Sequence, residues 1–139
     1  MCLLACLPVR PLLSQIAEEQ PLQLEAELEG RPRPNDVLVP CVLALFTAPS
    51  PNIRALAVST LNLLTDSMPA ALVQGLDGYL AGLFSLAHDT SAAVRKAVCT
   101  GLVHMVLIAP DRLRPSMPDI IEYMLASTQV GGGKGCHLA

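Results

Sequence analysis

The chain has 139 residues, of which 52% are hydrophobic, 15% are charged and 3% are aromatic, and its formal net charge is −3. This length suffices for one domain with an aliphatic core, and the acidic balance argues against a nucleic-acid-binding surface. A membrane-spanning helix needs roughly 20 mostly apolar residues. Prolines or charges interrupt the two most apolar stretches, 37–53 and 97–110, so we expect no membrane span.

The cysteines, at positions 2, 6, 41, 99 and 136, form neither a CxxC pair nor a regular framework. Cys41 and Cys99 lie in apolar runs that read as helices, where a small buried thiol is ordinary. We therefore expect reduced cysteines and an intracellular protein.

The N-terminal part of the chain is expected to precede the first complete structural unit. Residues 1–10 predict an irregular N-terminus. Residues 11–35 predict the end of a preceding repeat, apolar on one side of 11–20, followed by a connector rich in proline, glycine and alternating charge.

A first complete helical hairpin is predicted at 36–68. Its first helix covers about 36–47, with Pro40 either bending it or lying in its first turn. Its second covers about 52–67, with Ser50 placed to cap it and Pro51 at its first position. Helical spacing predicts an inner face. That face consists of Ile53, Ala57, Leu61 and Leu64.

The plan recurs in the rest of the chain. A second hairpin is predicted at 69–110, where Pro69 begins a turn. Its helices cover about 77–87, after breaks at Gly75 and Gly78, and about 92–109, ended by Pro110. A truncated third unit at 111–129 holds one helix starting near Pro118. The glycine-rich residues 130–139 predict a flexible, disordered C-terminal tail.

The two hairpins match each other after a shift of 41 residues, which takes Ile53-Arg54 to Val94-Arg95. A period of roughly 40–47 residues is typical of HEAT and armadillo repeats. Such a unit cannot bury its apolar faces alone and stacks on its neighbours. The pattern predicts an all-α fold, an α-solenoid of about two and a half HEAT repeats. It also favours protein binding along a surface over catalysis in a pocket.

Motifs for enzyme chemistry are weak throughout the sequence. The run from Gly131 to Gly135 lacks the strand and the hydroxyl residue of a phosphate-binding loop. Cys136 lies at a prenylation position, but His137 is a poor aliphatic substitute. The histidines are scattered, and the acidic residues suit turns and helix starts. We therefore expect no catalytic site, no metal and no cofactor, and not a small enzyme.

Asp89, followed by Val94-Arg95, resembles the HEAT signature. In that family the Asp and Arg form polar ladders between successive repeats, and the Val packs inward. The first hairpin keeps Ile53-Arg54 but has Ala48 where the Asp would fall, so its ladder is expected to be incomplete. A proline lies fourteen residues before Arg54, as in many HEAT helices. The expected structural signature comprises Pro40, Ile53, Arg54, Asp89, Val94 and Arg95.

Longer strings point to one branch of that family. LSQIAEEQ (13–20), SPNIRALAVSTLN (50–62), GYLAGLFSLAHDTSAAVRKAVC (78–99) and DRLRPSMPDIIEYMLASTQ (111–129) resemble the amino-terminal half of transportins. Transportins are nuclear import receptors of the karyopherin-β, or importin-β, family. The resemblance covers roughly residues 11–129. The acidic loop and the cargo-binding arch of the family are not contained in these 139 residues.

The resemblance implies a function and partners. The amino-terminal arch of the family engages the Ran GTPase in its GTP state, and the other arch holds cargo with a nuclear-localisation signal. Binding of Ran and of cargo are negatively coupled, and the receptor moves between cytoplasm and nucleus. The second helix of each repeat typically lines the concave side. The side chains nearest to a partner would then be Asn52, Arg54, Thr60, Arg95 and Lys96.

The sequence therefore predicts a fragment of a nuclear import receptor that is not an enzyme. Its implied partners are the Ran GTPase and nuclear-localisation-signal cargo, without nucleic acid, membrane or an obligate homo-oligomer. The alternative is a HEAT-repeat scaffold subunit of an enzyme complex such as a phosphatase. Those scaffolds have more uniform repeats just under 40 residues long. The fragment alone is expected to bind GTP-loaded Ran weakly or not at all.

Overall fold

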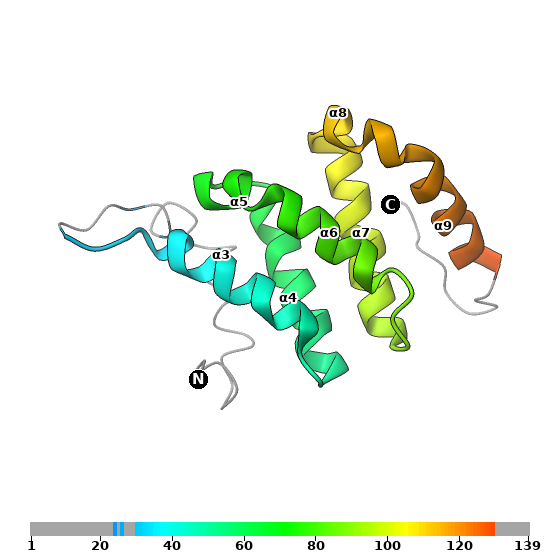
Figure 1. The fold of residues 1–139 in the computed structure, drawn as a ribbon, viewed down its shortest axis with the longest axis horizontal. Helices are drawn as coiled ribbons and strands as arrows, with labels where there is room; N and C mark the ends of the chain where they lie inside the picture. The colour runs from blue at the N-terminus through cyan, green and yellow to red at the C-terminus, as the bar shows by residue number, and fades with distance from the viewer. Residues whose placement is uncertain (1–23, 25, 27–29, 130–139) are drawn as a thin grey trace.

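The computed structural model describes Leu24, Ala26 and residues 30–129. The expectations for residues 1–10, for most of 11–29 and for the tail at 130–139 lie outside these described residues. Within the described part the chain is an all-α solenoid of HEAT-type helical hairpins, which confirms the predicted fold class. Figure 1 shows the helices following one another across the molecule in chain order, from α3 to α9.

The first hairpin consists of α3 (Pro34–Ala44), a short 3-10 turn η2 (Leu45–Thr47) and α4 (Pro51–Leu64). Helix α3 begins two residues before the expected start because Pro34 suits the first helical position, where an N–H has no partner to lose. Pro40 lies inside α3 and not in its first turn. It removes one backbone hydrogen bond there.

Helix α4 begins as predicted, with Ser50 at the N-cap and Pro51 first in the helix. The expected capping bond from the Ser50 side chain is wrong, since no side-chain cap is made. The backbone carbonyl of Ser50 instead accepts the N–H groups of Ile53 and Arg54, both at 3.1 Å. Backbone bonds alone start this helix.

The predicted end of α4 is too late by three residues. The helix stops at Leu64, where hydroxyl groups bond the last carbonyl oxygens: Thr65 Oγ1 donates to Asn62 O at 2.6 Å and Ser67 Oγ donates to Leu64 O at 3.3 Å. Met68 then takes a φ of 44°. It precedes a proline, which disfavours the helical conformation in the residue before it.

The second hairpin contains a helix that the sequence did not predict. The short α5 (Ala70–Gln74) follows Pro69 and packs against α3, with Leu72 fully buried. Gly75 separates it from α6 (Leu76–Leu86), and α7 (Ala92–Ile108) completes the hairpin. Gly78 lies inside α6, so the expected break at Gly78 is wrong.

The third unit begins with two short elements, α8 (Pro110–Leu113) and η3 (Arg114–Ser116), followed by α9 (Met117–Gln129). The start of α9 lies one residue from the predicted one. Within the described residues no single helix is long and apolar enough to cross a membrane. Only α7 together with 110–126 reaches that length and composition, and these two segments meet at a bend of 118°.

The core lies between the two hairpins. Helix α4 packs beside α7, while α3 contacts α4, α5 and α6. Ala57, Leu61 and Leu64 are buried as predicted, whereas Ile53 is only half-buried. The largest side chains with essentially no exposed surface come from both hairpins and from α8. They include Tyr79, Leu61, Leu64, Leu72, Leu83, Leu102, Met105 and Leu113.

Gly101 of α7 sits against a buried polar pair, and replacing it should destabilise the fold. A Cβ at Gly101 would lie 2.6 Å from Asn62 Oδ1 and 2.8 Å from the Tyr79 hydroxyl. We expect Gly101→Ala to lower the free energy of unfolding by about 1–3 kcal/mol, as overpacking does. The exposed Gly78 is the matched control, since its Cβ would come no nearer than 3.8 Å to Leu43 Cδ1.

Urea denaturation of both variants checks this expectation. Gly78→Ala should raise the free energy of unfolding by about 0.5–1 kcal/mol, because alanine favours a helix interior over glycine. Equal effects of the two substitutions would contradict the close packing of α7 on Asn62 and Tyr79.

Candidate functional site: the ladder between repeats

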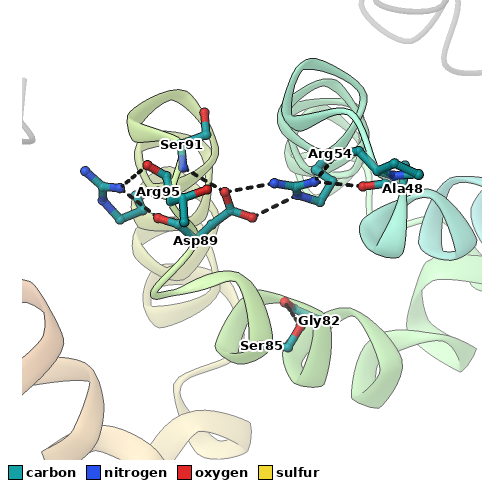
Figure 2. Close-up of polar contacts among 9 residues, drawn as sticks. Ala48, Arg54, Gly82, Ser85, Asp89, Ser91 and Arg95 are labelled. Carbon is teal, nitrogen blue, oxygen red and sulfur yellow. Dashed lines mark hydrogen bonds and ion pairs between the residues drawn. The ribbon is translucent and has the colours of Figure 1, made fainter.

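Three of the residues singled out in the sequence meet where the hairpins join (Figure 2). Arg54 lies in the first turns of α4, and Arg95 lies at the equivalent position of α7. Asp89 lies in the turn between α6 and α7, where the backbone reverses just before the second helix. The turn thus presents a carboxylate to the arginine of the preceding hairpin.

Arg54 binds Asp89 through two parallel hydrogen bonds. Arg54 Nε donates to Asp89 Oδ2 at 2.8 Å, and Nη2 donates to Oδ1 at 3.1 Å. The two side chains are 16% and 7% exposed. This bidentate arrangement, called the ladder contact below, is the strong form of an Arg–carboxylate pair. Partial burial shields it from solvent screening, unlike an ordinary surface salt bridge.

The remaining nitrogen of Arg54 holds its own hairpin turn. Arg54 Nη1 donates to the carbonyl oxygens of Ala48 at 2.8 Å and Pro49 at 3.0 Å. One guanidinium therefore ties the turn of the first hairpin to the turn of the second. Ala48 does not interrupt the ladder contact between these two hairpins, because Arg54 reaches forward to Asp89 of the next repeat.

Asp89 is held on its other side by its own turn. The Ser91 N–H donates to Asp89 Oδ1 at 2.8 Å, so an Asx-type turn orients the carboxylate. The hydrogen bonds from Arg54 are the largest cause that holds the pKa of Asp89 below its ordinary value. The Ser91 N–H and the charges of both arginines act in the same direction against the effect of burial.

The structure places the other signature residues apart from the ladder contact. Val94 is fully buried and Ile53 is half-buried, while Pro40 is exposed on α3. Arg95 uses Nη1 to hold the carbonyl oxygens of its own turn, at Asp89 and Thr90, with distances of 2.7 and 3.0 Å. Pro40 borders an open groove between α3 and α5 that also includes Gly75.

A buried polar connection that the sequence did not reveal lies deeper in the same interface. The Tyr79 hydroxyl donates to Asn62 Oδ1 at 2.6 Å, and Asn62 Nδ2 donates to Ala97 O at 2.9 Å. These bonds join α6, α4 and α7, and burial raises the pKa of Tyr79. The only signal for them in the sequence is a polar Asn62 within an apolar run.

The histidine of α7 contributes a third tie. Thr65 Oγ1 lies 3.2 Å from His104 Nδ1 and already donates its hydrogen to Asn62 O at 2.6 Å. His104 Nδ1 therefore carries the proton and donates to the threonine. His104 was expected to be a partly exposed or hydrogen-bonded structural residue, and it is half-buried and bonded in this way.

The chemistry available at this interface is attachment of one helical hairpin to the next. Its polar atoms bond one another or backbone carbonyl groups, which suits register and orientation. Among the described residues, no group of three or more His, Cys, Asp or Glu side chains could hold a metal ion.

Comparison with known proteins places the chain among transport receptors. No protein-family model matches it. Transportin-1 of Mus musculus is 38% identical over 117 residues, and Importin subunit beta-2 of Schizosaccharomyces pombe is 36% identical over the same number. Transportin of Dictyostelium discoideum is 32% identical over 117 residues. Each alignment covers 84% of this chain but only 12% or 13% of the relative.

Removing the arginine of the ladder contact should destabilise the stack of hairpins. Arg54→Gln leaves the largely buried Asp89 carboxylate without its bidentate donor, so we expect the free energy of unfolding to fall by about 1–3 kcal/mol. The control is Arg112→Gln. Its pair with Asp77 spans 3.4 Å, and the two side chains are 56% and 85% exposed.

Urea denaturation at neutral pH and low salt distinguishes the two variants. The control should change the free energy of unfolding by no more than about 0.5 kcal/mol, as exposed pairs do. If Arg54→Gln were as mild as Arg112→Gln, the ladder contact would not hold the hairpins together.

The ladder contact should also make stability depend on acid. Because folding lowers the pKa of Asp89, its stabilisation is fully present above the unfolded value of 3.8. That stabilisation is lost as the pH falls through the lower folded pKa. We expect the difference in free energy of unfolding between wild type and Asp89→Asn to shrink as the pH drops below 3.8. Urea denaturation in steps from about pH 6 to pH 2.5 measures this difference; a constant difference would be inconsistent with the proposed titration.

Proposed function

This chain is homologous to transportins and importin beta-2 proteins over 84% of its length, and from that relationship we propose that it forms part of a nuclear import receptor. The sequence identity carries the proposal, since a helical-repeat fold by itself serves many binding functions. The matched relatives are named as transportins and importins. That favours import over the alternative of a scaffold subunit in a phosphatase-type complex.

The architecture supports a binding role. Stacked hairpins make an extended surface, and each repeat contacts only its neighbours. Asn52 of α4 and Lys96 of α7 are exposed and available to a partner. Thr60 is only 2% exposed and donates to Leu56 O at 2.9 Å, so its expected place on the partner-facing surface is wrong.

The proposed partners are those of the family: the Ran GTPase in its GTP state and cargo proteins with nuclear-localisation signals. The proposed location is the cytoplasm and the nucleus, and the proposed activity is binding without catalysis. The chain spans about 13% of the length of the first relatives that it matches. A partner that contacts many repeats gains its affinity from all of them together. These residues alone should therefore bind Ran weakly.

A chimera tests the proposal. In mouse Transportin-1 the segment aligned to this chain is replaced by the corresponding 117 residues, and nuclear accumulation of a fluorescent import cargo is measured in permeabilised cells. We expect the chimera to retain import, because the same ladder contact and hairpin packing join the segment to its neighbours. A chimera carrying Arg54→Gln serves as the matched control and should import less. A stable, folded chimera without import activity would overturn the proposed function.

Binding of Ran to the 139-residue chain can be measured separately by titration with GTP-loaded and GDP-loaded Ran. We expect affinity for GTP-loaded Ran at least roughly 100-fold weaker than that of mouse Transportin-1, since most of the cooperating surface is missing. Comparable affinity for the two proteins would show that these repeats contain the main Ran contacts.

A further inference from the structure

A surface that α7 covers on the second hairpin recurs in exposed form one repeat later. Helix α7 packs against α4 and α6, and Leu80 of α6 is only 8% exposed. A shift of 41 residues takes Leu80 to Ile121 of α9, which is 52% exposed. The same shift takes the half-buried Phe84 to Leu125, which is 59% exposed. We call the surface made by Arg95, Ile121 and Leu125 the α7/α9 end face.

The arginine at this end face is oriented for a carboxylate. Arg95 Nη1 holds two carbonyl oxygens of its own turn at 2.7 and 3.0 Å, as Arg54 Nη1 does at 2.8 and 3.0 Å. Arg54 uses its other two nitrogens for Asp89. In Arg95, Nε and Nη2 have no acceptor within residues 30–129. The guanidinium is thus fixed by its turn while its bidentate edge stays available.

We propose that the α7/α9 end face binds an amphipathic helix whose N-terminal turn carries an aspartate or glutamate. The helix lies on α7 and α9 as α7 lies on α4 and α6. Its carboxylate accepts both hydrogen bonds from Arg95, and its apolar face covers Ile121 and Leu125. This is recognition of a helix by a groove between helices, with a charged pair that fixes direction and register. The proposal does not depend on a role in nuclear import.

A folded second copy of the chain does not fit this requirement. Its Asp89 is already bonded to its own Arg54, and its α7 is packed against its own α4. Its first hairpin turn presents Ala48 at the position equivalent to an acidic residue. Charge complementarity therefore selects a partner helix with an acidic turn over self-association.

The test supplies such a helix to the full chain. Residues 88–109, which contain Asp89 and the whole of α7, are duplicated after Ala139 through a flexible Gly/Ser linker of about 15 residues. The tether gives the added helix an effective concentration near millimolar. Hydrogen–deuterium exchange of α9 is then measured with and without the added helix. We expect exchange in α9 to slow by roughly tenfold or more when the helix binds.

Matched variants separate the carboxylate from general stickiness. Asp89→Asn in the added copy should remove most of the protection of α9 in the otherwise unchanged host. In a host with Arg95→Gln the same change in the copy should have no further effect, because the acceptor's partner is gone. A host with Lys96→Gln, changed at an exposed neighbouring residue, should behave as wild type. Circular dichroism verifies that each host is folded.

Three results would overturn the proposal. Unchanged exchange in α9 would mean that the added helix does not bind there. Equal loss of protection with the Asn copy in the wild-type and Arg95→Gln hosts would mean that the carboxylate does not act through Arg95. Protection that grows with protein concentration would point to a second copy as the occupant.

Discussion

A helical hairpin has more apolar surface than its own two helices can cover, and this constraint governs the whole molecule. Helix α4 buries Val58, Leu61 and Leu64 completely, and α7 buries Val98, Leu102 and Met105. Both sets lie on one shared core between the hairpins. Burial of each such side chain is worth about 1.5–3 kcal/mol, so the stacking of hairpins is the main source of stability. A single hairpin would leave one of these faces in water.

Apolar burial has no direction, so polar contacts must set how one hairpin lies on the next. The ladder contact joins the hairpin turns, Asn62 bonds the carbonyl oxygen of Ala97 in the middle, and Thr65 accepts from His104 towards the other end of α4. The first two contacts join residues 35 apart in sequence. Sliding α7 along α4 would break all three together and leave buried polar groups unpaired, at a cost of about 1–3 kcal/mol for each.

The same contacts suit a protein that binds others along a surface. Because the ladder contact lies at the turns, exposed positions such as Asn52 and Lys96 remain available without disturbing the core. The relationship to transportins gives this surface its proposed use in import, and the α7/α9 end face adds a second place for contact. Each role depends on a defined angle between hairpins, which the polar ties supply.

The sequence alone contained the repeat of 41 residues, and with it the helical class, the two hairpins and the pairing of Arg54 with Arg95 as equivalent positions. These features follow from local rules: apolar spacing, prolines at helix starts and a proline after α7. It also contained the resemblance to transportins, which the comparisons support. What local rules could not supply was the partner of each polar group. Ala48 suggested an incomplete ladder, yet Arg54 reaches forward to Asp89 of the next hairpin.

The tertiary structure decided the remaining details because they depend on contacts between residues distant in sequence. Gly78 continues α6 where a break was expected, since packing of α6 against α3 and α7 outweighs the weak helix propensity of one glycine. Leu72 forms part of an unpredicted helix because α3 offers it a buried position. Asn62 and Tyr79 are ordinary helix residues in the sequence, and only the approach of three helices turns them into a buried hydrogen-bonded pair.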